Sequence, residues 1–238
     1  MTTTCYDFLV RSYRQYCALA RTLDVVGERW TLLIIRELFS CDSRYTDLRD
    51  SLPGIASNLL ADRLRQLQAD GIVESYEAPR PVRATVYRLT TRGRRLGPAL
   101  RALVSWGAPL VAEPQGDHAF RTHWLALGLP TFFDSVDVAD LAPLTVVVHT
   151  GDEPATLQVS ASGLAMDVGT AVIEDAVVVE GEPGDIVALL SGTADTETSA
   201  GVTIHGPRDA VRRLHTLTSR SRIATWQTAP CTHEGGDR

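Results

Sequence analysis

The stretch YTDLRDSLPGIASNLLADRLRQLQA, residues 45–69, decides the fold of the first half of this 238-residue chain. The pair Pro53-Gly54 separates two segments with helical spacing, Tyr45–Leu52 and Ser57–Ala69. Leucines in the second segment recur after four and three residues, so they share one helix face. Helix, tight turn and helix is the outline of a DNA-reading unit. The opposite face would meet a groove, and it carries Asn58, Ala61, Asp62 and Arg65.

A hairpin is predicted after this unit, from the β-like runs Ile72–Tyr76 and Thr85–Leu89. The connection holds two prolines, which disfavour extended pairing at its tip, and two cations, Arg80 and Arg83. Such a hairpin can touch the sugar-phosphate backbone, so we interpret it as a wing.

Helices are expected on both sides of these elements. An amphipathic helix is predicted from Leu9 to near Gly27, and Trp30–Phe39 is apolar almost all round, which is typical of a buried core helix. After the hairpin, Thr90 opens a last helix. Its apolar stripe needs a partner surface, which a second subunit can provide, and consists of Leu96, Leu100 and Leu103.

Short motifs follow one another through this half: Cys17, LDVVGERWT (23–31), YTDL (45–48), LPGI (52–55), RL (63–64) and YRLTTRG (87–93). In this order they resemble the HxlR family of bacterial transcriptional regulators, over roughly residues 17–107. The resemblance implies a homodimer held by its terminal helices, with the fourth helix in a major groove and the wing along the backbone. Two operator half-sites would lie about 34–36 Å, or a multiple of that, apart.

The DNA-contacting residues predicted from this pattern are Thr46, Ser57, Asn58, Ala61, Asp62, Arg63, Arg65, Arg80 and Arg83. The sequence departs from the family's pattern at four places, which are Ala56, Asn58, Ala61 and Val86. Asn58 can still read adenine through a bidentate contact worth roughly 1–3 kcal/mol. For Arg63, an ion pair with an acidic neighbour is as reasonable as a phosphate contact.

The four cysteines, at positions 5, 17, 41 and 231, lack the paired short spacings of a zinc site. Several HxlR-family members sense quinones, aldehydes or oxidants through a cysteine at the place of Cys17, so the resemblance makes this thiol a redox candidate, with Cys5 as a resolving thiol. The alternative is a buried structural thiol, since free cysteine behaves as a small hydrophobe.

Charge is divided unevenly along the chain. Residues 1–110 hold 16 Arg against 11 acidic residues, whereas residues 111–238 hold 7 against 18. A basic half beside an acidic half suggests a nucleic-acid-binding module joined to another domain. With 44% hydrophobic and 22% charged residues, the composition excludes a wholly disordered or fibrous chain. The start lacks a secretory pattern and no apolar run is long enough to span a bilayer, so we expect a cytoplasmic protein without membrane contact.

The second half predicts an α+β layout after a boundary near residues 107–117. A helical region is expected in His118–Ser135. The expected strands are Leu144–His149, Thr156–Ser160, Leu164–Val168 and Ala176–Glu180, and the expected later helices are Pro183–Leu190 and Pro207–Leu217. The domains are therefore predicted as 1–110, mainly α winged helix-turn-helix, and 118–225, α+β.

Two phrases share a strand, glycine turn and helix start: VVVEGEPGDIVALLSG (177–192) and VTIHGPRDAV (202–211). Together they resemble a sterol-carrier-protein-like domain, over roughly residues 118–218. This resemblance implies a shell of sheet and helices around an apolar pocket for a small hydrophobic or aromatic molecule. The candidate lining residues, whose alternative role is to fill a core, are Phe120, Trp124, Phe132, Phe133 and Met166.

These patterns predict a dimeric regulator that binds a double-stranded DNA operator and responds to a small effector in its acidic half. No catalytic residues, metal ligands or cofactor are predicted, because no acid/base pair, phosphate loop or metal-ligand spacing stands out. Two alternatives remain: a winged-helix scaffold repurposed as a small-molecule-binding protein or as an enzyme acting at the domain boundary, and a redox-sensing regulator that uses Cys17.

Overall fold

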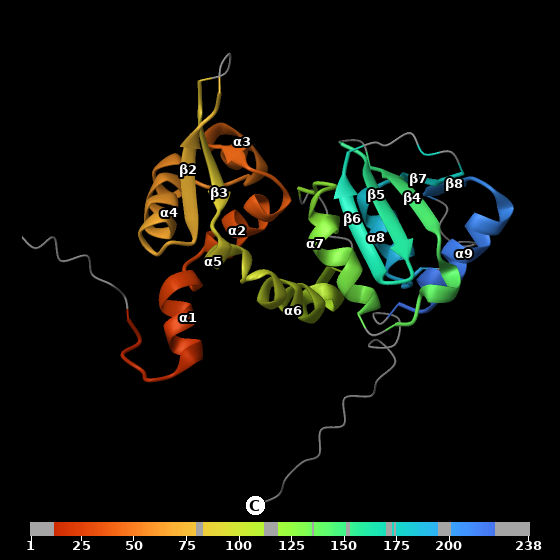
Figure 1. Ribbon diagram of the computed structural model, residues 1–238, viewed down its shortest axis with the longest axis horizontal. Coiled ribbons are helices and arrows are strands. Elements are labelled where there is room, and N and C mark those ends of the chain that lie inside the picture. Colours follow the sequence, from red (N-terminus) through yellow and green to blue (C-terminus); the bar gives the residue numbers. More distant parts are fainter. Residues whose placement is uncertain are drawn as a thin grey trace, which may run out of the picture. The chain divides into compact units, whose positions relative to one another are not determined.

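The computed structural model describes residues 12–79, 83–111, 119–134, 136–150, 153–169, 173, 175–194 and 201–221. The chain divides into two compact units, Met1–Gly97 and Pro98–Arg238, and Figure 1 labels most of their helices and strands. Helix α6 (Gly97–Gly107) groups with the second unit. The domain bounds 1–110 and 118–225 stay a prediction, and most of the connection expected between them lies outside the described residues, which stop at 111 and resume at 119.

The first unit is a winged helix-turn-helix, as predicted. Its strands form an antiparallel sheet in the order β1-β3-β2, and the hairpin β2–β3 is visible above the helices in Figure 1. The elements are α1 (Ala18–Val26), α2 (Thr31–Ser40), β1 (Ser43–Arg44), α3 (Tyr45–Ser51), α4 (Ser57–Ala69), β2 (Val73–Glu77), β3 (Thr85–Leu89) and α5 (Thr91–Arg94).

The core of this unit forms around α2 and the leucine face of α4. Ile34, Ile35 and Leu38 of α2 have almost no exposed surface, which confirms the predicted core helix. The three leucines of α4 are equally buried: Leu60, Leu64 and Leu67. Because these leucines recur at helical spacing, their burial turns the opposite side of α4 toward solvent.

The first helix is shorter than predicted. Residues 12–17 are not helical, and α1 begins at Ala18. The Asp24 carboxylate accepts hydrogen bonds from the Tyr13 amide, at 2.9 Å, and from the Ser12 hydroxyl, at 3.0 Å. The Asp24 side chain thus bonds residues 12 and 13 in a non-helical conformation. A positive φ of 52° at Arg14 also interrupts helical geometry.

The helix predicted from Thr90 is also interrupted. The short helix α5 ends at Arg94, and α6 begins at Gly97. Pro98 explains the new start, because proline lacks an amide hydrogen and is tolerated in a first helical turn but not in a helix interior. Of the predicted stripe, Leu100 is buried, Leu96 is half-buried and Leu103 is 51% exposed.

The base of the wing is joined to α5 by one compact set of contacts. Thr90 caps α5 by accepting the Gly93 amide at 3.0 Å, and its own amide donates to the Ile72 carbonyl at 3.0 Å. A Cβ atom at position 93 would lie 2.2 Å from that same carbonyl oxygen. Glycine is therefore required here by the close approach of two backbone segments.

The second unit is an α+β structure. Its five-stranded sheet has the order β6-β5-β4-β7-β8, in which β4 and β7 are parallel and the other neighbours are antiparallel. The remaining elements are α6, η1 (Ala108–Val111), α7 (Trp124–Gly128), η2 (Leu129–Phe133), η3 (Ala139–Leu141), β4 (Leu144–His149), β5 (Ala155–Ser160), β6 (Gly163–Val168), β7 (Val177–Gly181), α8 (Pro183–Leu190), β8 (Val202–His205) and α9 (Arg208–Ser219).

Helices cover one face of this sheet, and α8 lies behind it in the view of Figure 1. The core combines alternate strand residues, such as Val146, Leu157 and Val179, with Ile186 of α8 and Leu214 of α9. Exposed polar side chains alternate with them on the other face: Gln158, Asp167, Glu180, Thr203 and His205. The predicted α+β layout is thus confirmed, whereas a sterol-carrier-like identity stays a prediction.

The C-terminal end of α9 is tied to η3. The Arg220 guanidinium donates two hydrogen bonds to the Asp140 carboxylate, at 2.7 and 2.8 Å, and one to the Asp137 carbonyl. These bonds lower the pKa of Asp140 below its ordinary value. None of the helices among the described residues is long and apolar enough to cross a membrane.

Replacing Gly93 with alanine is expected to destabilise the protein by about 1–3 kcal/mol, because the added methyl group would overlap the Ile72 carbonyl. Urea unfolding of the full chain measures the loss. Gly107→Ala is the matched control, since nothing lies within 4 Å of a Cβ atom there. Equal stabilities for the two variants would contradict the steric argument.

Candidate nucleic-acid interface

The predicted reading helix α4 is oriented by contacts with α3 and with the turn between them. The Tyr45 hydroxyl, at the start of α3, donates a 2.6 Å hydrogen bond to the carbonyl of Ser57, at the start of α4. In the turn, the Ile55 amide donates to the Leu52 carbonyl, and Gly54 adopts a φ of +91°. The sequence motif included Tyr45, but its role was missed because the contact joins residues twelve positions apart.

The exposed face of α4 carries the predicted base-contacting side chains. Ser57, Asn58, Asp62 and Arg65 are exposed, and Ala61 is half-buried. Asp62 and Arg65 form an ion pair one turn apart. Within the described residues the Asn58 amide makes no hydrogen bond, so its donor and acceptor are both available to a ligand.

Arg63 points to the interior of the module instead of this face. Its guanidinium lies 2.8 Å from the Glu28 carboxylate and donates a longer bond, of 3.4 Å, to the Arg29 carbonyl. The Arg63 side chain is 21% exposed and that of Glu28 is 37% exposed. This geometry favours the ion-pair interpretation of Arg63 over a direct phosphate contact. Glu28, which the sequence analysis did not single out, joins the α1–α2 turn to α4.

Trp30 lies beside the same turn. It precedes α2 with a left-handed φ of 76°, an uncommon conformation for a bulky residue. The Arg29 guanidinium lies 5.5 Å from the centre of its ring, and a Cβ atom at Gly54 would be 3.8 Å from the far edge of the indole. The half-buried ring therefore packs under the helix-turn-helix, as expected of a structural residue.

The strands of the wing are crosslinked by exposed polar pairs. Arg88 lies 2.7 Å from the Glu74 carboxylate and stacks 5.0 Å from the centre of the Tyr76 ring. The Tyr76 hydroxyl donates to Asp42 at 3.1 Å, and this bond raises the pKa of the phenol. Arg88 thus neutralises the charge of Glu74 on the wing. The sequence did not indicate this role.

Several arginines lie on the wing or near its base. Arg83 is exposed at the foot of the predicted wing tip, whereas Arg80 lies outside the described residues. Arg92 donates to the Asp70 carbonyl at the end of α4. Arg94 and Arg95 are exposed and make no ion pair with any described residue. Thr46 is exposed at the start of α3 and donates to Asp47 at 3.3 Å.

Cys17 is exposed at the N-cap of α1, so the alternative of a buried thiol does not describe it. Cys5, the suggested resolving thiol, lies outside the described residues. Where side chains are described, no group of three or more His, Cys, Asp or Glu could hold a metal ion.

The predicted ligand-binding residues come together in the second unit. Phe132, Phe133 and Met166 are buried in its core, and Phe120 packs against that core. Phe120 meets Trp124 edge to face, with ring centres 6.2 Å apart. This packing agrees with the interpretation that these side chains fill a core, and their role in ligand binding stays a prediction.

A double-mutant cycle tests whether Arg63 and Glu28 act as a pair. We expect Arg63→Met and Glu28→Gln to couple by about 0.5–1 kcal/mol in urea unfolding, because the pair is partly buried and hydrogen-bonded. The control cycle, Arg65→Met with Asp62→Asn, should couple less, since both side chains are more than half exposed. Strict additivity at Arg63 and Glu28 would contradict the assignment.

Part of the chain is similar in sequence to known HTH-type transcriptional regulators. The HTH-type transcriptional regulator sll1512 of Synechocystis is 36% identical over 92 residues, which cover 39% of this chain and 68% of that protein. YvaP of Bacillus subtilis is 31% identical, covering 36% and 80%, and Rv3095 of Mycobacterium tuberculosis is 38% identical, covering 42% and 62%. The chain thus spans about two thirds of the length of the first and third of these regulators.

Solved structures give similar matches. The HTH-type regulator YtcD is 29% identical, with 41% of this chain and 99% of that chain covered and a TM-score of 0.38. The redox regulator HypR in its reduced form is 30% identical, covering 39% and 92%, with a TM-score of 0.37. The family model described as HxlR-like helix-turn-helix matches residues 25–114. The chain belongs to the HxlR-like family of helix-turn-helix transcriptional regulators.

Proposed function

We propose that this protein is a dimeric regulator that reads an inverted-repeat operator with α4 and changes its DNA affinity when a small hydrophobic or aromatic effector binds its second unit. The observation that carries the proposal is the division of α4 into a buried leucine face and an exposed polar face. A helix of this kind enters a major groove with its N-terminal residues against the bases.

The exposed side chains of α4 have the chemistry of base recognition. Asn58 offers both a donor and an acceptor, which match the N7 and N6 groups of adenine. One turn later, the Asp62–Arg65 pair offers a carboxylate for cytosine and a guanidinium for guanine. Exposed hydroxyls at the starts of α3 and α4, on Thr46 and Ser57, are suited to phosphate contacts.

Arginines outside α4 supply the electrostatic part of the binding. Arg83, Arg94 and Arg95 are exposed, and they lie on or after the wing. Contacts of this kind release counterions from DNA, so affinity falls steeply as salt rises. Arg63 is assigned the separate role of holding α4 in position, since its guanidinium is engaged by Glu28.

Exposed apolar side chains support the dimer. Leu19 and Leu23 of α1 are 66% and 38% exposed, and an apolar stripe along α6 and η1, consisting of Leu103, Trp106 and Leu110, is 51–67% exposed. Contiguous exposed apolar surface marks interaction sites in soluble domains. A second copy of the chain is the partner proposed for both surfaces, and it would place two copies of α4 on successive half-sites.

The effector is assigned to the second unit, whose sheet-and-helix core gathers the candidate aromatic residues. An effector changes operator affinity only if it favours one conformer, typically by about 1–3 kcal/mol. An enzymatic role is not proposed, because the similar proteins reported above are transcriptional regulators.

DNA titrations at two salt concentrations test the proposal, with the promoter region upstream of the protein's own gene as the probe. We expect specific binding that weakens steeply with salt. Asn58→Ala should lower specific affinity by roughly 10-fold or more, through loss of one bidentate base contact. Arg83→Ala should weaken all sequences alike and reduce the salt slope by about one.

Arg212→Ala is the matched control, since Arg212 is exposed on α9 and pairs with Asp209, three positions earlier in the same helix. An affinity that ignores salt, or equal losses in the Asn58 and Arg212 variants, would count against DNA reading by α4.

Redox control through Cys17 is a second candidate, favoured by the exposure of this thiol at the N-cap of α1. Under this hypothesis, diamide weakens operator binding by the native protein and by Cys41→Ser, but not by Cys17→Ser. Cys41 is the fitting control because it is also exposed. An unchanged diamide response in Cys17→Ser would reject Cys17 as the sensor.

A further inference from the structure

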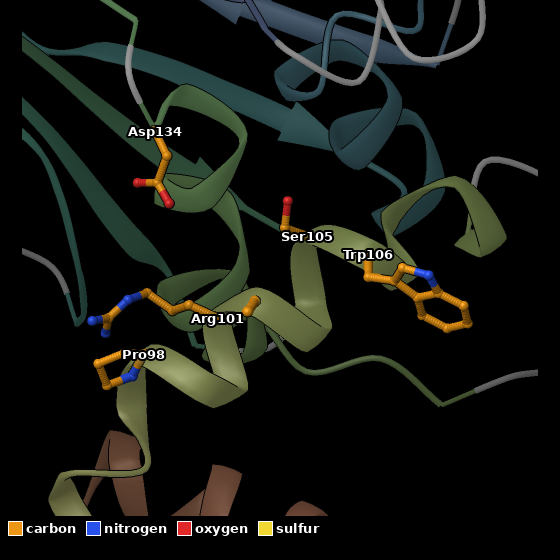
Figure 2. A pocket seen from close by; sticks show the side chains of 6 residues that line it. Pro98, Arg101, Ser105, Trp106 and Asp134 are labelled. Carbon is orange, nitrogen blue, oxygen red and sulfur yellow. The ribbon is translucent and has the colours of Figure 1, made fainter. Parts of the chain in front are cut away.

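A hollow lies on the second unit between α6 and the residue that ends η2. Its volume is about 520 Å³, and it is open to solvent, since five of its six lining residues are exposed. Figure 2 shows the side chains around it. The lining residues are Pro98, Arg101, Ala102, Ser105, Trp106 and Asp134.

Both walls of the hollow are anchored in packed structure. On α6, Leu100 and Ala108 are buried, and Val104 packs so closely against Gly128 of α7 that a Cβ atom there would lie 3.3 Å from it. On the other wall, Asp134 directly follows two buried phenylalanines, and its amide donates to the Thr131 carbonyl. The backbone on both sides of the hollow is therefore held in place by packing.

The lining of the hollow includes one cationic and one anionic side chain that do not form an ion pair with each other. Arg101 and Asp134 are exposed, and neither makes an ion pair or side-chain hydrogen bond with any described residue. Figure 2 shows Arg101 and Asp134 on the side of the hollow away from Trp106. A guanidinium matches a carboxylate ligand in bidentate geometry, and a carboxylate accepts hydrogen bonds from an ammonium group.

The rest of the lining is apolar. Pro98 and Ala102 present aliphatic surface, and the Trp106 indole stands at the far end of the hollow and points out of it in Figure 2. A ligand that binds both charges can therefore extend an apolar group along Ala102 toward the indole.

We propose that this hollow binds a free α-amino acid with an apolar side chain, its carboxylate on Arg101 and its ammonium on Asp134. The proposal deepens the effector-responsive function inferred above and moves the effector site from the aromatic core to the α6 surface. Only its regulatory meaning rests on that proposed function, because binding itself requires no DNA.

Trp106 gives the site a route to regulation. The same side chain lines the hollow and belongs to the apolar stripe of α6 and η1 assigned to the dimer. A bound amino acid contacts the indole from one side, while a second subunit covers it from the other. Occupation of the hollow then alters the dimer contact and, through it, the spacing of the two copies of α4.

Calorimetric titration of the full-length protein tests the ligand class with three probes: L-phenylalanine, 3-phenylpropanoate and 2-phenylethylamine. The amino acid is expected to bind with a Kd of roughly 1 mM or tighter. Each analogue lacks one charged group and should bind about 10-fold more weakly or worse. Absence of binding by L-phenylalanine at tenfold that concentration, or equal binding of all three probes, overturns the proposal.

Variants then test the assigned contacts. Arg101→Met should lose the preference for L-phenylalanine over 2-phenylethylamine, and Asp134→Asn should lose the preference over 3-phenylpropanoate. Arg212→Met, on α9, is the control and should keep both preferences, with circular dichroism verifying that each variant folds. Native preferences in both hollow variants would contradict the site.

Operator titration with and without L-phenylalanine separates the two proposals. A change in DNA affinity that disappears in Arg101→Met supports the effector site. Calorimetric binding without any change in DNA affinity overturns the regulatory role. Calorimetric binding by a protein that does not bind DNA at any salt concentration overturns the proposed function and leaves the amino-acid site standing.

Discussion

Burial of the leucine face of α4 is the constraint on which the first unit depends. A helix that turns Leu60, Leu64 and Leu67 into the core must turn Asn58, Asp62 and Arg65 outward, because these positions lie on the opposite side of the same cylinder. The Tyr45 hydroxyl and the Arg63 guanidinium then fix the helix at its start and middle. The exposed polar face of α4 is thus a consequence of core packing, and a change that loosens the core also disturbs the positions of the side chains on that face.

Local sequence patterns predicted most of this unit. Pro53-Gly54 and the leucine spacing were enough to locate the two helices and the outward face of the second, since both signals act within a few residues. What the pattern left open was decided by distant partners. Arg63 had two reasonable roles until the structure placed it against Glu28, 35 positions away. The predicted start of the first helix was wrong, because the Tyr13 amide donates to the Asp24 carboxylate and not to a helical carbonyl.

The second unit shows a similar division. Alternating apolar residues predicted its strands, but not their order or the parallel pairing of β4 with β7, which depends on how the chain crosses over. For Phe132 and Phe133 the sequence showed only that the side chains are apolar. It could not distinguish a core position from a pocket wall, because both use the same residue types. No local sequence pattern indicated the hollow, because it forms where α6 lies beside Asp134. That residue follows Arg101 of α6 by 33 positions in the chain.

The partly buried pair of Arg63 and Glu28 also separates two kinds of electrostatics within one module. Mobile ions screen exposed charges over a Debye length of about 8–10 Å, whereas charges withdrawn from solvent are screened much less. Arg83, Arg94 and Arg95 stand in the first situation, and Arg63 stands closer to the second. Under the proposed function, ionic strength therefore acts on how firmly the exposed arginines hold a phosphate backbone, and much less on the orientation of α4.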